Sequence, residues 1–139
     1  MTQAESIQAE LDRLVRKFVD ACGRAVDEVV IARPDGLVVY SYGTSLSGTQ
    51  KRSIAALITL IMGSSKKAYM QLRDDELQTV LMEGRRSKLI LKSVRVGSGR
   101  DLYIGVLVSP NETTDVNIGL VLLMLDDLIE KLKDLFKIR

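Results

Sequence analysis

No histidine occurs among the 139 residues of the chain, and there is a single cysteine and no tryptophan. Histidine is the commonest general base at neutral pH and the commonest metal ligand, so its absence argues against that catalysis and those metal sites. The lone thiol, Cys22, can form no internal disulfide and, without histidine, no Cys/His zinc site. We therefore expect no catalytic residue, cofactor or metal, in a protein from a reducing compartment.

Long apolar runs are missing as well. The longest, residues 120–125, is far shorter than the ~20 residues that a membrane-spanning helix needs. Residues 1–10 are polar and acidic and lack the apolar centre of a signal peptide. These features predict a cytoplasmic protein without stable membrane insertion. The formal net charge of +2 and the 4% of aromatic residues give little support to a nucleic-acid partner, and none is expected.

What remains is the composition of a globular domain, 46% hydrophobic and 27% charged. Apolar residues recur at helical or strand intervals in eight segments. They predict helices over 2–22, 49–72 and 114–137 and strands over 29–32, 37–40, 77–83, 88–96 and 100–108. Short links indicate antiparallel neighbours. The expected fold class is α/β (α+β), one domain over residues 1–139, with a five-stranded antiparallel sheet, helices on both faces and the order α-β-β-α-β-β-β-α.

The loop before the middle helix shares one property with a phosphate-binding P-loop, since Gly43 and Gly48 have the spacing of its two glycines. The motif then requires lysine followed by serine or threonine, but Thr49 and Gln50 occupy those positions. Without that lysine, no side chain reaches the outer phosphates. We favour an ordinary strand-to-helix loop in which Ser47 or Thr49 is the N-cap. A weak anion site at the start of the helix is the alternative.

The other polar groups are interpreted as surface features. The carboxylates, chiefly those at 74–76 and 126–127, show no sign of burial and should be solvated. Cys22 ends an apolar helical stripe and is expected to be a buried structural residue. Basic residues near two hairpins are interpreted as charged edges that resist aggregation or as a protein-docking patch, ahead of a nucleic-acid or membrane patch. They are Arg85, Arg86, Lys88, Lys92, Arg95 and Arg100.

The middle helix carries the most informative pattern. The arc that should face the sheet consists of Ile54, Leu57, Ile58, Ile61, Met62, Ala68, Tyr69 and Leu72. A second stripe consists of Ala56, Leu60, Gly63, Lys67 and Met70. A helix on a sheet needs only one apolar face, and glycine inside a helix costs about 1 kcal/mol relative to alanine. The close approach of a second copy explains both features; cover by loops of the same chain is the alternative.

Three stretches of the sequence follow a known pattern. Residues 29–39 form an apolar strand, a turn containing Asp35-Gly36 and a second apolar strand; residues 53–57 are an Ala-rich helix start; and residues 111–120 lead into a final helix with Gly119 near its start. In these stretches the chain resembles the Roadblock family, which includes dynein light-chain regulators and MglB-type bacterial polarity proteins. The similarity covers about residues 10–135. One departure is Asp27-Glu28, where family members often have glycine.

The resemblance implies a Roadblock/longin/profilin-like fold, with the middle helix on one face of the sheet and the terminal helices on the other. It implies a homodimer, or pairing with a paralogue, through the middle helix and the strand after it. It also implies a protein-binding role rather than an enzyme, because family members bind small Ras-like GTPases or scaffold larger assemblies.

The first hypothesis is accordingly a dimeric regulator or scaffold of a small Ras-like GTPase, such as a GTPase-activating protein. The residues expected to share the dimer and partner contacts are Ala56, Leu60, Gly63, Lys67 and Met70, with Lys66 and Arg73 at the rim. A structural adaptor of a larger assembly without a GTPase partner is the alternative. A small-ligand or nucleotide sensor that uses the loop at residues 43–48 is a weaker alternative.

Overall fold

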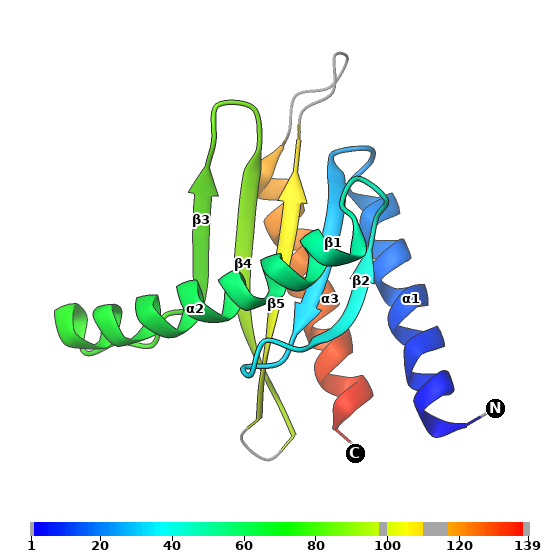
Figure 1. Cartoon of the computed structure of the whole chain (residues 1–139), viewed down its shortest axis with the longest axis horizontal. Coiled ribbons are helices and arrows are strands. Elements are labelled where there is room, and N and C mark those ends of the chain that lie inside the picture. The colour runs from blue at the N-terminus through cyan, green and yellow to red at the C-terminus, as the bar shows by residue number, and fades with distance from the viewer. Residues whose placement is uncertain (1, 98–99, 110–116, 138–139) are drawn as a thin grey trace.

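The structure is a computed structural model that describes residues 2–97, 100–109 and 117–137. Its elements follow the predicted order, so the expected fold class is confirmed (Figure 1). They are α1 (Gln3–Ala21), β1 (Val26–Ala32), β2 (Val38–Tyr42), α2 (Gly48–Arg73), β3 (Thr79–Glu83), β4 (Lys88–Val96), β5 (Arg100–Val108) and α3 (Ile118–Phe136). No helix in this described part of the chain is long and apolar enough to cross a membrane.

The five strands form one antiparallel sheet in the order β2-β1-β5-β4-β3. β1 and β5 lie side by side near the middle, with Ile31 opposite Ile104, so the first and last strands of the chain pair directly. Gly36 completes the turn between β1 and β2 with a φ of +89°, a conformation that glycine adopts readily. In this strand order, β2 and β3 are the two edges of the sheet.

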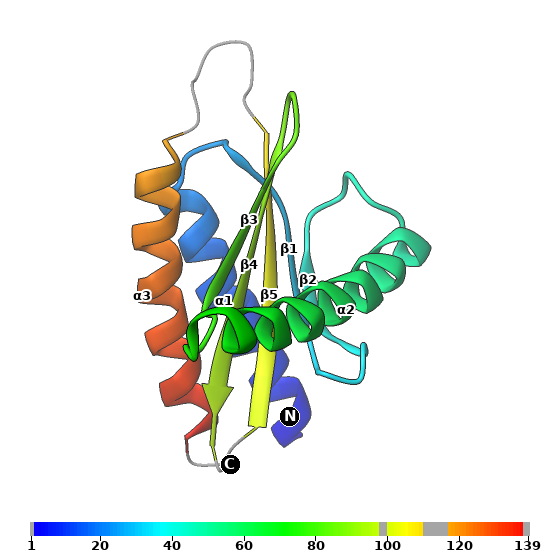
Figure 2. The ribbon, with the colours of Figure 1, turned by 90° about the vertical axis from the view of Figure 1, so that its left-hand side faces the viewer.

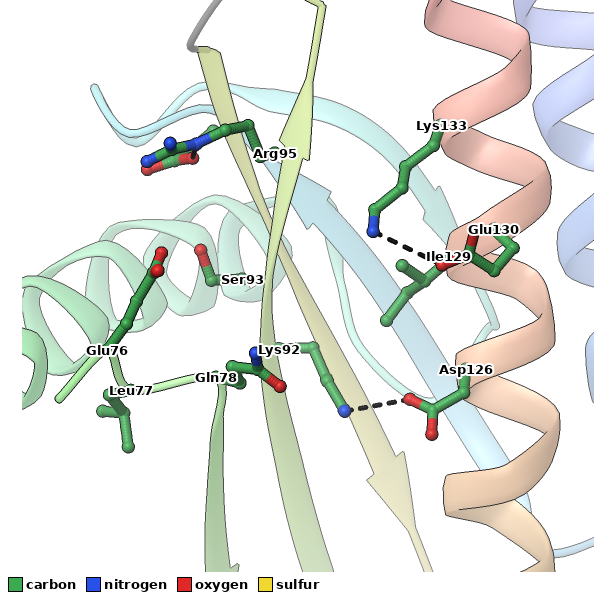
Figure 3. Close-up of a pocket in the computed structure, with 11 residues that line it drawn as sticks. Glu76, Leu77, Gln78, Lys92, Ser93, Arg95, Asp126, Ile129, Glu130 and Lys133 are labelled. Carbon is green, nitrogen blue, oxygen red and sulfur yellow. Dashed lines mark hydrogen bonds and ion pairs between the residues drawn. The ribbon is translucent and has the colours of Figure 1, made fainter.

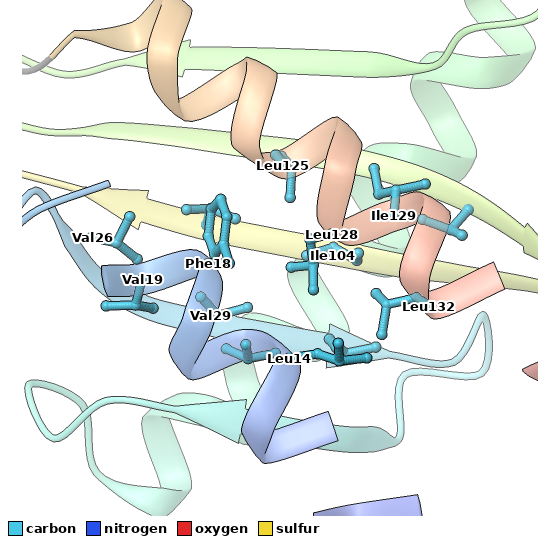
Figure 4. Packing of buried hydrophobic residues seen from close by; sticks show 14 of the residues in the cluster. Leu14, Phe18, Val19, Val26, Val29, Ile104, Leu125, Leu128, Ile129 and Leu132 are labelled. Carbon is cyan, nitrogen blue, oxygen red and sulfur yellow. The ribbon is translucent and has the colours of Figure 1, made fainter. Parts of the chain in front are cut away.

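The larger core lies between the sheet and the pair of helices α1 and α3, which cover one face together (Figures 2 and 4). α1 begins at a capping box, as its sequence predicts: Glu5 N–H donates to Thr2 Oγ1 (3.1 Å), and Thr2 N–H donates to Glu5 Oε2 (3.0 Å). Figure 4 shows side chains of both helices meeting those of the central strands, among them Phe18, Val29, Ile104, Leu125 and Leu128.

Helix α2 covers the opposite face by itself (Figure 2). Ile58 and Met62 are its largest buried side chains, and they share a smaller core with Leu91 and Tyr103 of the sheet. A Cβ atom at Gly105 of β5 would lie 2.5 Å from Cδ1 of Ile58, so the glycine allows the helix to pack closely on the sheet. The distribution of helices over the two faces agrees with the expectation.

Two element boundaries differ from the prediction in an informative way. β1 begins at Val26 rather than at residue 29, because Val26 pairs with Val108 although two acidic residues interrupt its apolar run. α3 begins at Ile118, after the N-cap Asn117, whose Oδ1 accepts a hydrogen bond from Leu120 N–H (3.0 Å). The predicted start of this helix, at residues 114–116, lies outside the described residues.

Candidate protein-interaction surface

Helix α2 is held in place at its N-terminus by its own capping residues. Gln50 N–H donates to Ser47 Oγ (3.1 Å), and Ser47 N–H donates to Gln50 Oε1 (2.8 Å). Ser47 is therefore the N-cap, as one of the two predicted choices had it. The loop between Gly43 and Gly48 thus supplies the N-cap of α2.

A buried carboxylate anchors the same loop to the sheet. Glu28 of β1 is 1% exposed, and its Oε1 accepts hydrogen bonds from Ser45 Oγ (2.8 Å) and Leu46 N–H (2.9 Å). Lys51 Nζ lies 3.9 Å from Glu28 Oε2 and donates to Gly43 O at 2.6 Å. The expectation that the carboxylates are solvated is wrong at Glu28. Two donors bind its Oε1, whereas the buried Oε2 has no hydrogen-bond partner among the described residues and only the Lys51 ammonium near it, so the desolvation is offset in part.

The hydrogen bonds of Glu28 argue against nucleotide binding by the loop at residues 43–48. Two donors of the loop, Ser45 Oγ and Leu46 N–H, already bind a carboxylate of the chain itself. A phosphate bound by these donors would have to displace Glu28 and leave that carboxylate buried with fewer partners, which is costly. The geometry therefore favours a structural role for the loop over an anion site.

The exposed side of α2 carries the second stripe predicted from the sequence. The Leu60 side chain is 64% exposed, and Ala56, Lys67 and Met70 are exposed with it. A Cβ atom at Gly63 would have no atom of a neighbouring element within 4 Å. In the described residues, no loop covers this stripe. The alternative in which the same chain covers α2 is therefore not what the structure shows.

The two residues predicted at the rim occupy different environments. Lys66 bends toward the sheet, where its Nζ donates to Ser93 Oγ (2.7 Å) and lies 3.4 Å from Asp101 Oδ2. The same ammonium lies 5.1 Å from the centroid of the Tyr103 ring. Arg73, in contrast, is exposed at the last turn of α2. Lys66 thus holds α2 on the sheet, whereas Arg73 is accessible to a partner.

Sequence reasoning missed part of this surface. Leu57, Tyr69 and Leu72 were assigned to the arc that faces the sheet, but all three are exposed, Leu72 by 77%. For Tyr69 and Leu72 the assignment is wrong because α2 runs across the strands and its last turns extend beyond β3 (Figure 1), where no strand lies beneath them. Leu57 lies nearer the start of the helix and is exposed because it points away from the side that Ile58 and Met62 bury. On β3 itself, Leu81 and Met82 are also exposed. Helical periodicity alone could not reveal how far the sheet extends.

One polar hollow of the described residues has no features of a built ligand site. It lies between α3 and β4, has a volume of about 440 Å³ and is lined mostly by charged side chains (Figure 3). Lys92 pairs with Asp126 (2.9 Å) and Lys133 with Glu130 (3.4 Å), so these charges already have partners. Among the described residues, no group of three or more potential ligands could hold a metal ion.

Cys22 is confirmed as a buried residue, and burial raises the pKa of its thiol to about 11. A thiol reacts as the thiolate, so the folded protein should be nearly inert at pH 8. We expect a disulfide reagent such as DTNB to modify native Cys22 at least about 100-fold more slowly than the unfolded chain, because burial lowers the thiolate fraction and also blocks access to the sulfur. Equal rates with and without guanidinium chloride would contradict this burial.

Comparisons with known proteins agree with the fold. A sequence model described as the Roadblock/LC7 domain matches residues 21–106. Myxococcus xanthus MglB has a TM-score of 0.73 at 20% identity, with 98% of this chain and 91% of that chain covered. The Roadblock/LC7 domain from Streptomyces avermitilis has a TM-score of 0.72 at 20% identity, covering 88% and 94%.

A further solved structure, described as MglB with tetrameric arrangement, has a TM-score of 0.77 at 13% identity and covers 94% of this chain and 90% of that one. At identities this low, the likeness to these structures establishes the fold alone. Among curated proteins, none matches the sequence.

Proposed function

The chain belongs to the Roadblock/LC7 family, which its sequence matches over residues 21–106, and from this premise we propose that it is a dimeric regulator or scaffold of a small Ras-like GTPase. Members of the family are generally regulatory or adaptor proteins rather than enzymes. The proposed role has two parts. The chain self-associates through α2, and the surface that the dimer forms recognises a GTPase in the cytoplasm.

The exposed apolar face of α2 carries this proposal. Leu60 and Met70 are large apolar side chains on this face, and each is at least about half exposed. Leu72, which is 77% exposed, adds apolar surface where the helix extends beyond the sheet. Full burial of such a side chain contributes about 1.5–3 kcal/mol. Apolar surface gathered in this way on a soluble domain is typical of a protein-binding site. A solved relative described as having a tetrameric arrangement supports self-association.

The mechanism that we propose is conformational. Two α2 helices side by side would form one continuous surface, and the switch regions of the GTPase would bind there in one nucleotide state. Such binding can regulate hydrolysis without a catalytic residue from this chain, since positioning and charge stabilisation can come from the GTPase itself. Lys67 and Arg73 are exposed on this surface and suit the rim of such a contact.

The test is binding to a purified small Ras-like GTPase from the same cell, loaded either with GDP or with a non-hydrolysable GTP analogue. We expect clear preference for one nucleotide state, and loss of binding when Leu60 is replaced by aspartate. Leu123→Asp, on the outer side of α3, should bind normally, because Leu123 is similarly exposed but lies on the opposite face of the sheet. GTP hydrolysis measured in the same samples separates activation from recruitment.

Equal binding to both nucleotide states, or none, would count against a GTPase regulator. Purification of the native protein in a large assembly that lacks a GTPase would then favour the structural adaptor.

A further inference from the structure

The buried part of helix α2 ends well before the helix does. Its buried residues lie at or before Met62, whereas the helix continues to Arg73. Within α2, all of which the structure describes, no residue after Met62 is buried. The last turns, which carry Lys67 and Met70 of the proposed partner surface, project beyond β3 (Figure 1). Apolar packing therefore does not fix the direction of this projecting end, residues 67–73.

The sequence just after the buried part favours bending. Gly63, Ser64 and Ser65 follow one another there. Glycine and serine are weaker helix formers than alanine, and glycine–serine pairs are among the places where helices kink. The helix nevertheless runs unbroken from Gly48 to Arg73. The direction of the projecting end thus depends on contacts made after residue 65.

Lys66 makes such a contact on the side of α2 that faces the sheet. Its ammonium donates to Ser93 Oγ of β4 (2.7 Å), lies 3.4 Å from Asp101 Oδ2 of β5 and is 5.1 Å from the centroid of the Tyr103 ring. Ser93 and Tyr103 lie opposite each other in the sheet. Among the described residues, these are the only hydrogen bonds and ion pairs that join residues 63–73 to the sheet.

The surroundings of this ammonium suit it closely. The side chains of Lys66 and Asp101 are only 23% and 25% exposed, so solvent screens their contact less than on an open surface. A hydroxyl, a carboxylate and the face of an aromatic ring together serve the donors and the charge of the ammonium. Arg95 Nε lies 3.6 Å from Asp101 Oδ1, so the carboxylate keeps a partner when Lys66 is removed. Loss of Lys66 should therefore release the projecting end without stranding a charge.

We propose that Lys66 is a positioning residue: it sets the direction of the projecting end of α2, and thereby the affinity of the surface at Lys67 and Met70 for its partner, without touching the partner. From Lys66 to Arg73 the helix extends about 10 Å, so a kink of about 20° at residues 63–65 moves the tip by about 3–4 Å. The inference rests on the proposed function for the partner, a GTPase. The contact between Lys66 and the sheet does not depend on it.

The first test measures amide hydrogen exchange in the chain carrying Leu60→Asp, so that self-association does not mask a local change. Lys66→Met removes the ammonium and should speed exchange at residues 67–73 about 10-fold, while residues 48–62 exchange as before. Lys66→Arg keeps a cation and its donors and should retain most of the slow exchange. Adding Asp101→Asn to Lys66→Met should cause little further change, because both substitutions remove the same contact.

Lys92→Met is the matched control. Lys92 precedes Ser93 on β4 but pairs with Asp126 of α3 at 2.9 Å, and its side chain is 14% exposed. The same substitution there removes a shielded ion pair on the opposite face of the sheet, and it should leave exchange at residues 67–73 unchanged. The positioning role is wrong if Lys66→Met does not speed exchange at residues 67–73. It is equally wrong if exchange rises as much over residues 48–62, since that is a general loosening of the helix.

The second test measures the dissociation constant for the GTPase in its preferred nucleotide state, with Leu60 in place. Lys66→Met should weaken binding about 5- to 10-fold, because the partner must then pay to order the projecting end. Lys66→Arg should retain most of the affinity, and Lys92→Met should bind as wild type does. Faster local exchange with undiminished binding would overturn the link to the partner. A wild-type chain that binds no GTPase would overturn the proposed function and this effect on affinity, while exchange still decides whether Lys66 positions the helix.

Discussion

Leu60→Asp is expected to convert the dimer into a folded monomer. Leu60 is 64% exposed in the single chain and would be buried twice in a two-fold interface, once from each copy. Each burial contributes about 1.5–3 kcal/mol, so its loss should raise the dissociation constant by at least about 100-fold. An unpaired aspartate in the interface adds a desolvation cost. Sedimentation velocity over a range of concentrations measures the change.

The matched control is Leu123→Asp, because Leu123 is 61% exposed and lies on α3, across the sheet from α2. It should sediment as wild type does. Gly63→Phe is an independent test. A side chain at Gly63 would contact no neighbouring element of the same chain, so the monomer should fold. The phenylalanine should, however, prevent two α2 helices from approaching closely. If both α2 variants dimerise like wild type, the interface is elsewhere.

Gly43→Ala is expected to be among the most destabilising single substitutions in the chain. Gly43 has a φ of +114°, which residues with a side chain rarely adopt. A Cβ atom there would overlap both the buried carboxylate of Glu28 and the carbonyl oxygen of Asp27, and the backbone carbonyl cannot move aside easily. Strain and overlap together should lower the free energy of unfolding by about 3 kcal/mol or more. Urea denaturation at fixed protein concentration measures it.

Gly36→Ala serves as the comparison for backbone strain alone. Gly36 has a φ of +89°, but a Cβ atom there would make only an ordinary contact, 3.7 Å from Ala56 Cα. Gly36→Ala should lower the free energy of unfolding by about 1–2 kcal/mol. If the two glycine variants lose equal free energy of unfolding, Glu28 does not pack tightly against the loop.

Much of the fold could be predicted because its signals are local. The turn ending at Gly36, the capping box of α1 and the alternation of short apolar strands all depend on residues a few positions apart. The stripe of Leu60, Gly63 and Met70 could be predicted for the same reason, since the winding of a helix alone places these residues on one side.

The rest depended on contacts between residues far apart in the sequence. Glu28 is buried because Ser45 and Leu46 return to it from a later loop, and nothing near Glu28 in the sequence signals those donors. Leu72 satisfies the helical period of the core arc, yet it is exposed because the sheet ends before the helix does. Lys66 was placed at a partner rim, but Ser93 and Asp101 of the sheet bind it.

The central claim is that the exposed face of α2 is an interface between two copies of the chain, and the mass of the wild-type protein in solution tests it most directly. Light scattering after size exclusion should give about 31 kDa, twice the 15.4 kDa of the chain. A mass of 15.4 kDa at all accessible concentrations would contradict the claim, because the apolar face of α2 would then remain uncovered in solution.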